Sequence, residues 1–128
     1  MISTNKLRKA MREIAAKKGD FTLFGLFMRA DAPGTWDLVV SAPWLEEGKL
    51  KALAEFTDLL AESIGEQSLK EFSRVVTLNR RDTTLNSLVS TFSVDDGEVR
   101  VKRSNLFGLE IEDGIIFRAK RAAAGTAA

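Results

Sequence analysis

The sequence predicts an α+β fold in which a single, largely antiparallel sheet of about six to seven strands packs against two helices. Apolar residues recur at helical spacing in two segments, residues 4–18 and 43–63. Short runs of strand-forming residues, separated by turns that contain glycine, fill most of the remaining chain. Only the second helix lies between strands, which excludes a doubly wound parallel sheet.

The first helix begins at Ser3 or Thr4, either of which can cap it, and ends near Lys18, just before Gly19. Its apolar residues share one stripe: Leu7, Ala10, Met11, Ile14 and Ala15. The other positions are mostly basic, and Glu13 interrupts them. We expect this helix to pack on the sheet with its basic face in solvent, rather than to act as a targeting or membrane-surface segment.

A hairpin follows, with strands at 21–29 and 35–42 around a turn that contains Pro33 and Gly34. The first strand is apolar on both faces and is therefore expected near the centre of the sheet, covered on both sides. The second strand alternates, with Trp36, Leu38 and Val40 on one face and Asp37, Val39 and Ser41 on the other.

The long helix runs from Pro43 to about Ser63 and stops at Gly65. Its expected buried stripe comprises Leu50, Leu53, Phe56, Leu60 and Ile64. After a link or short extra turn at 67–71, we expect a strand at 73–79, a turn at 80–83 and a further strand at 85–94.

Two more hairpins are expected in the last third of the chain. A turn at Asp96-Gly97 would place Val94 opposite Val99, and a loop at 112–114 would place Ile111 opposite Ile115. Residues 1–121 are thus predicted to form one α+β domain, followed by a mobile tail at 122–128.

Composition restricts the chemistry that this chain can perform. It has no cysteine, histidine or tyrosine, which excludes thiolate sites, the Ser-His-Asp triad and the commonest metal ligand. No motif for a cofactor is found, so we predict none and favour a protein that is not an enzyme. An apolar run at 21–28 is too short to span a membrane and no secretory signal is recognisable, so we expect a cytoplasmic protein without membrane contact.

The junction WDLVVSAPW, residues 36–44, resembles in outline the strand-to-helix turns at which many enzymes bind ligands. However, Pro43 and Trp44 crowd the turn, and Glu46 and Glu47 follow in the first helical turn, where they would repel a phosphate. Ser41 has no histidine to activate it as a nucleophile. We therefore interpret the junction as structural, with Trp44 packing across the strand end or facing a partner.

A minor alternative is an enzyme that holds Mg²⁺ through Asp37, Asp95 and Glu98, because carboxylate oxygens suit this ion. Asp96-Gly97 is also an ordinary turn sequence, and the spacing to Lys102 does not match a nuclease motif of the Glu-x-Lys type.

Basic residues gather at both ends of the chain. Residues 1–20 carry six basic and two acidic side chains, and residues 100–121 carry six basic and three acidic ones, around an acidic middle. In the predicted hairpins one sheet face presents four cations: Arg100, Lys102, Arg118 and Lys120. They could contact phosphates of a nucleic acid, or pair with acids such as Glu110 and Glu112 on a solvated face.

Eight phenylalanines and two tryptophans are many for one small sheet with two helices. Part of this apolar surface could be buried between subunits, and Trp44, Leu106 and Phe107 are the candidate interface residues. The leading hypothesis is a non-catalytic cytoplasmic protein-interaction domain that forms a homodimer through its sheet face or edge. A nucleic-acid-associated protein that uses the basic face is the alternative.

Overall fold

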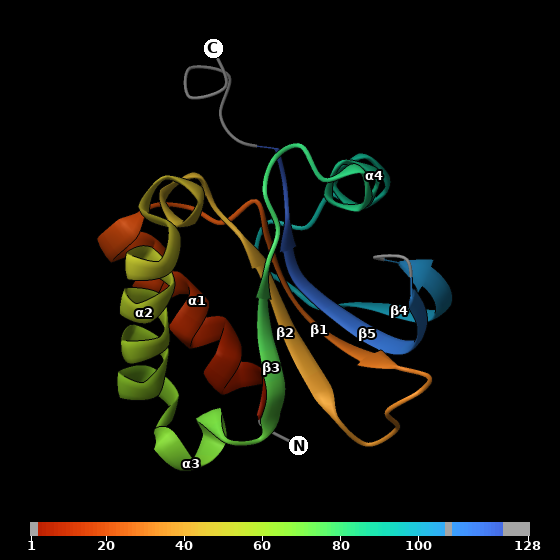
Figure 1. Cartoon of the computed structure of the whole chain (residues 1–128), viewed down its shortest axis with the longest axis horizontal. Coiled ribbons are helices and arrows are strands. Elements are labelled where there is room, and N and C mark those ends of the chain that lie inside the picture. Colours follow the sequence, from red (N-terminus) through yellow and green to blue (C-terminus); the bar gives the residue numbers. More distant parts are fainter. Residues whose placement is uncertain (1–2, 107–108, 122–128) are drawn as a thin grey trace.

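Five strands form one mixed sheet in the order β3-β2-β1-β5-β4 (Figure 1). The computed structural model describes residues 3–106 and 109–121. The strands are β1 (Leu23–Arg29), β2 (Trp36–Ser41), β3 (Phe72–Thr77), β4 (Val99–Leu106) and β5 (Leu109–Ala119). β2 and β3 run parallel, whereas the other neighbouring pairs are antiparallel. The α+β class is confirmed, and the sheet is largely antiparallel as predicted, since three of its four strand pairs are antiparallel. The predicted number of six to seven strands is wrong, because the described residues form five.

Helices α1 (Thr4–Lys18) and α2 (Pro43–Ile64) cover one face of the sheet (Figure 1). As predicted, Ser3 caps α1 by accepting a hydrogen bond from the Lys6 N–H, and Gly19 follows its last turn. The apolar stripe of α1 is buried except for Ala15, which is half-buried, and Phe56, Leu60 and Ile64 of α2 are buried too. These side chains form one core with Phe24, Leu26, Leu38 and Val40 from the strands.

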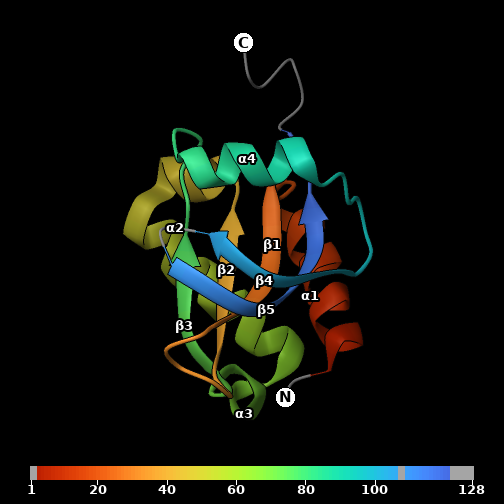
Figure 2. The ribbon, with the colours of Figure 1, turned by 90° about the vertical axis from the view of Figure 1, so that its right-hand side faces the viewer.

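A second core lies on the opposite face of the sheet. Figure 2 shows α4 (Thr83–Thr91) across one end of this face, with β4 and the start of β5 passing in front of the other strands. The second core joins Leu23 and Phe27 of β1 to Val39, Leu85 and Leu88. The prediction that the first strand is central and covered on both faces is therefore confirmed, as is the hairpin that joins it to the second strand.

The long helix is interrupted near its start, which displaces one predicted core residue. Lys49 has φ 51° and ψ −131°, outside the helical region. Because this break changes the phase of the helix, Leu50 points into solvent and is 82 % exposed, while Leu45 and Ala52 are buried. The prediction of Leu50 as a core residue is wrong, whereas the end of the helix at Gly65 is confirmed. A short helix, α3 (Glu66–Leu69), occupies the predicted link.

The predicted strand at 85–94 is wrong, because this segment forms α4. Asp82 caps the helix by accepting hydrogen bonds from the N–H groups of Thr84 and Leu85. Leu85, Leu88 and Phe92 contact the second core, and their spacing suits a helix better than a strand. With no strand at 85–94 to pair with it, β3 instead lies parallel to β2 after the crossover through α2.

Both hairpins predicted for the last third of the chain are wrong. Val94 bridges Ala119 rather than pairing with Val99, and β5 continues through 112–114 without a turn. β4 and β5 do form an antiparallel pair, with Val101 opposite Gly114. Ile115 and Phe117 face the first core, whereas Val101 faces the second, so these apolar residues of β4 and β5 do not share one face of the sheet.

No helix in the described ranges is both long and apolar enough to cross a membrane. The predicted tail at 122–128 lies outside the described residues.

Candidate functional site

The outer edge of β3 is open as far as the described residues show. Within residues 3–106 and 109–121, β3 pairs with β2 and lies at the end of the strand order. Leu78 donates its N–H to the Val40 carbonyl on the inner side. Because hydrogen-bonding directions alternate along a strand, the N–H groups of Val75 and Thr77 point outward. This edge is therefore a template on which another strand can pair.

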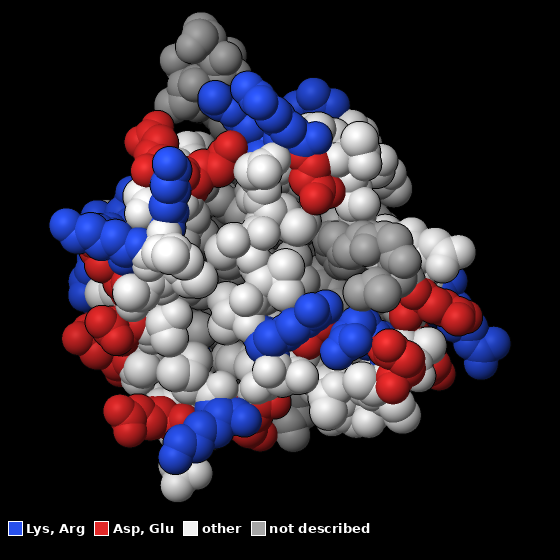
Figure 3. All heavy atoms as spheres, in the orientation of Figure 1, with Lys and Arg blue, Asp and Glu red and all other residues white. Residues whose placement is uncertain are grey.

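A groove of about 280 Å³ lies beside this edge, between β3 and α2. Its apolar lining comprises Leu45, Leu50, Leu53 and Leu78. Leu50 is the large apolar side chain that the break at Lys49 turns into solvent. Figure 3 shows that the surface between α2 and β3 is largely uncharged, with charged side chains above and below it. Apolar surface next to an open strand edge is typical of protein contacts rather than of catalysis.

Charges of opposite sign mark the two ends of β3. Near its start, Glu66 and Glu71 are exposed, together with Lys70. Beyond its end, Arg80 and Arg81 are exposed. Arg80 Nε lies 3.9 Å from Glu46 Oε1, and an exposed ion pair at this distance contributes little to stability. The edge is thus more acidic at the start of the strand and more basic past its end.

Two of the four predicted cations, Arg100 and Lys102, lie on β4 and share one acidic partner. Arg100 Nη1 is 3.1 Å and Lys102 Nζ 3.2 Å from Oδ2 of Asp113, which lies on β5. Both cations remain more than half exposed at the side chain. They therefore form a small cross-strand ion-pair cluster on the sheet surface.

The other two cations, Arg118 and Lys120, belong to a separate network at the end of β5. Arg118 is buried; its Nη1 lies 2.6 Å from Asp20 Oδ1, and its Nε donates to the Asp95 carbonyl at 2.6 Å. Lys120 Nζ contacts Asp20 at 3.2 Å and Asp95 at 3.0 Å. The structure thus divides the predicted basic face into two clusters, each with its own carboxylates.

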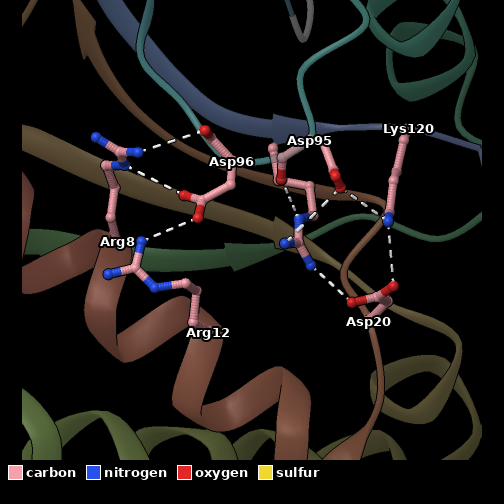
Figure 4. A network of polar contacts seen from close by, with 7 residues as sticks. Arg8, Arg12, Asp20, Asp95, Asp96 and Lys120 are labelled. Carbon is pink, nitrogen blue, oxygen red and sulfur yellow. Dashed lines mark hydrogen bonds and ion pairs between the residues drawn. The ribbon is translucent and has the colours of Figure 1, made fainter.

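Asp96 extends this network to α1 (Figure 4). Its carboxylate accepts hydrogen bonds from Arg12 at 2.9 Å and from Arg8 at 3.2 Å. The hydrogen bond from Arg12 is the main cause of a lowered pKa at Asp96, and that from Lys120 is the main cause of a lowered pKa at Asp95. The same bond to Asp95 raises the pKa of Lys120. These contacts fix the loop at 92–98 against α1 and β5, a structural role.

The predicted interface residues have different surroundings. Trp44 is half-buried; its Nε1 donates to the Gly19 carbonyl at 3.1 Å, and its ring packs against Phe21 and Phe56. Leu106 is also half-buried and packs against the second core. Phe107 lies outside the described residues.

The acids of the minor metal alternative do not come together. Asp37 is buried and accepts hydrogen bonds from Arg29 and Arg74 at 3.2 and 3.0 Å. Asp95 binds Lys120 instead. In the described part of the chain, no group of three carboxylates is arranged to hold a metal ion.

Sequence reasoning missed both the open edge of β3 and the exposure of Leu50. The Asp82 cap and the spacing of Leu85, Leu88 and Phe92 were signals for α4 that would have removed the strand expected to cover β3. The one sequence signal for the break is Gly48, a glycine inside the predicted helix; Lys49 itself gives none, because lysine is not a residue that favours positive φ.

Comparisons with known proteins add no relative: no protein-family model, curated protein or solved structure matches this chain.

Proposed function

We propose that this chain is a non-catalytic protein-interaction domain that associates with a second copy of itself through the outer edge of β3. The observation that carries the proposal is the open backbone of β3 next to the groove that contains the exposed Leu50. Pairing of two such edges would extend the sheet and cover the groove.

Charge supports a second copy in an antiparallel, two-fold arrangement. Such an arrangement places the end of β3 in one copy beside its start in the other. Arg80 and Arg81 would then approach Glu66 and Glu71 of the second copy. Unlike charges would meet at both ends of the contact, which favours this orientation over a parallel one.

The alternative nucleic-acid function has less support. Each of its four cations already forms an ion pair with Asp113, Asp20 or Asp95, and Arg118 is buried. Phosphate binding would have to displace these carboxylates. A nucleic-acid partner predicts retention on heparin that falls steeply with salt and weakens in a variant carrying Arg100→Ala and Lys102→Ala.

Sedimentation equilibrium of the whole chain tests the self-association. We expect a mass of about twice the 14.1 kDa of one chain, and a dissociation constant at least about tenfold larger for Leu50→Glu. Ala54→Glu is the matched control, because it adds the same charge at an exposed position of α2 outside the groove. A monomer at millimolar concentration, or equal effects of the two substitutions, would overturn the proposal.

A further inference from the structure

A second hollow, separate from the β3 edge, lies where α1 ends, α2 begins and β5 finishes. Its volume is about 450 Å³, within the range of roughly 300–1,000 Å³ typical of small-molecule sites. It includes the turn at Pro43 and Trp44, which the sequence marks as crowded. The structure shows instead that the two side chains form part of the wall of a concave surface.

The apolar wall of the hollow is held in place before any ligand arrives. The Trp44 ring packs against Phe21 at a centroid distance of 5.9 Å, and its Nε1 is fixed by the Gly19 carbonyl. Gly19 has φ +125°, and a Cβ at this position would lie 3.3 Å from Trp44 Cδ1. A rigid aromatic face loses little conformational freedom when a flat molecule packs on it. Lys18 Nζ lies 5.9 Å from the centroid of the Trp44 ring, so a molecule packed there also contacts or displaces this exposed ammonium group.

The charges around the hollow select the kind of ligand. Three cations line it, Lys18, Lys120 and Arg121, against two acids, Asp20 and Glu47. Lys18 forms an ion pair with Glu55, and Lys120 forms ion pairs with Asp20 and Asp95.

Arg121 differs from the other two cations. Within the described ranges it forms no ion pair, and its Nη2 donates to the neutral hydroxyl of Ser90 at 2.8 Å. Because carboxylates already neutralise Lys18 and Lys120, Arg121 is the lining cation left to pair with a ligand, so the hollow suits a single negative charge. A phosphate chain would meet repulsion from Asp20 and Glu47.

We propose that this hollow binds a flat aromatic molecule that carries one carboxylate. The ring packs on Trp44, and the carboxylate pairs with the guanidinium of Arg121, whose planar donors match a carboxylate in shape. This inference does not depend on self-association through β3, since the hollow and the β3 groove share no lining residue.

The test is a ¹H–¹⁵N NMR titration of the whole chain with 2-naphthoate. The chain has two tryptophans, so two indole N–H signals are expected, and Trp36→Phe identifies the signal of Trp44. We expect the Trp44 signal to shift saturably while that of Trp36 stays in place. The neutral analogue 2-naphthylmethanol and the dianion 2-naphthyl phosphate should both bind more weakly than 2-naphthoate.

Two arginine variants make the result specific. Arg121→Ala is expected to raise the dissociation constant for 2-naphthoate about tenfold, because it removes a charge-assisted hydrogen bond. Arg103→Ala removes an exposed arginine that lies neither in the hollow nor at the β3 edge and should leave the constant unchanged. No saturable shift of the Trp44 signal, equal binding of the neutral analogue, or equal behaviour of the two variants would overturn the proposal.

Discussion

The ring of Phe27 occupies the space that a side chain at Gly114 would need. The two residues are paired across β1 and β5, and a Cβ added to Gly114 would lie 2.9 Å from Phe27 Cδ1. The same ring limits Gly25, whose added Cβ would lie 3.1 Å from Phe27 Cε2. Gly114 is therefore present in a strand because a buried aromatic ring covers it, and not because the chain turns there.

Gly114→Ala is predicted to destabilise the fold by about 1–2 kcal/mol. The crowding of a packed core costs about 1–3 kcal/mol, and the reduced freedom of the unfolded chain offsets part of this. Gly97→Ala is the control, since its Cβ would lie 3.5 Å from Val94, an ordinary contact. Urea unfolding measures the stability of both variants. Equal unfolding midpoints for Gly114→Ala and Gly97→Ala would contradict the role assigned to Phe27.

The packing of Phe27 on Gly114 is an example of a contact that the sequence alone does not reveal. Elements with a local cause, such as the Ser3 cap of α1 and the β1–β2 hairpin, are predicted correctly. The Asp113-Gly114 pair is typical of a turn, but its conformation depends on a ring 87 positions earlier in the chain. Local propensity cannot reveal such long-range packing.

The same distinction applies to the candidate sites. Lys102 and Arg100 were predicted to be exposed, and they are, but their shared partner Asp113 depends on the register of β4 against β5. The open edge of β3 follows from strand order, and the hollow at Trp44 from the meeting of three segments, 18–22, 43–47 and 120–121. Neither is a property of neighbouring residues in the sequence.

Lys49→Gly is predicted to stabilise the protein by up to about 1 kcal/mol. Lys49 has φ 51°, where a non-glycine residue carries strain of about 1–3 kcal/mol, and glycine relieves more strain than its extra freedom costs. Lys51→Gly, made in the regular part of α2, should instead destabilise by about 1 kcal/mol. Thermal unfolding measures both changes in stability. If both substitutions stabilised the protein, or both destabilised it, strain would not be assigned to Lys49.

Gly48→Ala, next to the break in α2, is predicted to destabilise the protein. A Cβ on Gly48 would lie 2.4 Å from the Cβ of Ala52, a buried residue, so the backbone would have to move. We expect a loss of about 1–3 kcal/mol in the free energy of unfolding. Ala52→Gly in the same chain should recover part of this loss by removing the clash. Chemical denaturation of the single and double variants measures the recovery, and its absence would place the strain elsewhere.

Asp37→Ala is predicted to cost about 1–3 kcal/mol in stability. The buried carboxylate joins β1 and β3 through Arg29 and Arg74, and its loss leaves Arg29, which is mostly buried, without this partner. Arg74→Ala should cost less, because the Arg74 side chain is 49 % exposed and Asp37 retains Arg29. Guanidinium unfolding compares the two variants. A larger loss for Arg74→Ala would contradict this ranking.

Low pH is predicted to weaken the contacts that hold the loop at 92–98 against α1 and β5. Hydrogen bonds from Arg12 to Asp96 and from Lys120 to Asp95 lower the pKa of each carboxyl in the folded chain. The unfolded chain, with an ordinary aspartate pKa of about 3.9, therefore binds more protons as the pH falls below about 4. The stabilisation is present above this range and is lost as the pH falls through the lowered values.

Asp96→Asn tests this dependence on pH. At pH 7 we expect a loss of less than about 1 kcal/mol, because the ion pairs are partly exposed, and the loss should shrink as the pH falls below about 4. Glu98→Gln is the control; Glu98 is exposed in the same loop and forms no ion pair within the described ranges. Urea midpoints at pH 7 and pH 3 measure the change. A difference between wild type and Asp96→Asn that stays constant with pH would show that Asp96 stabilises the loop by something other than its charge.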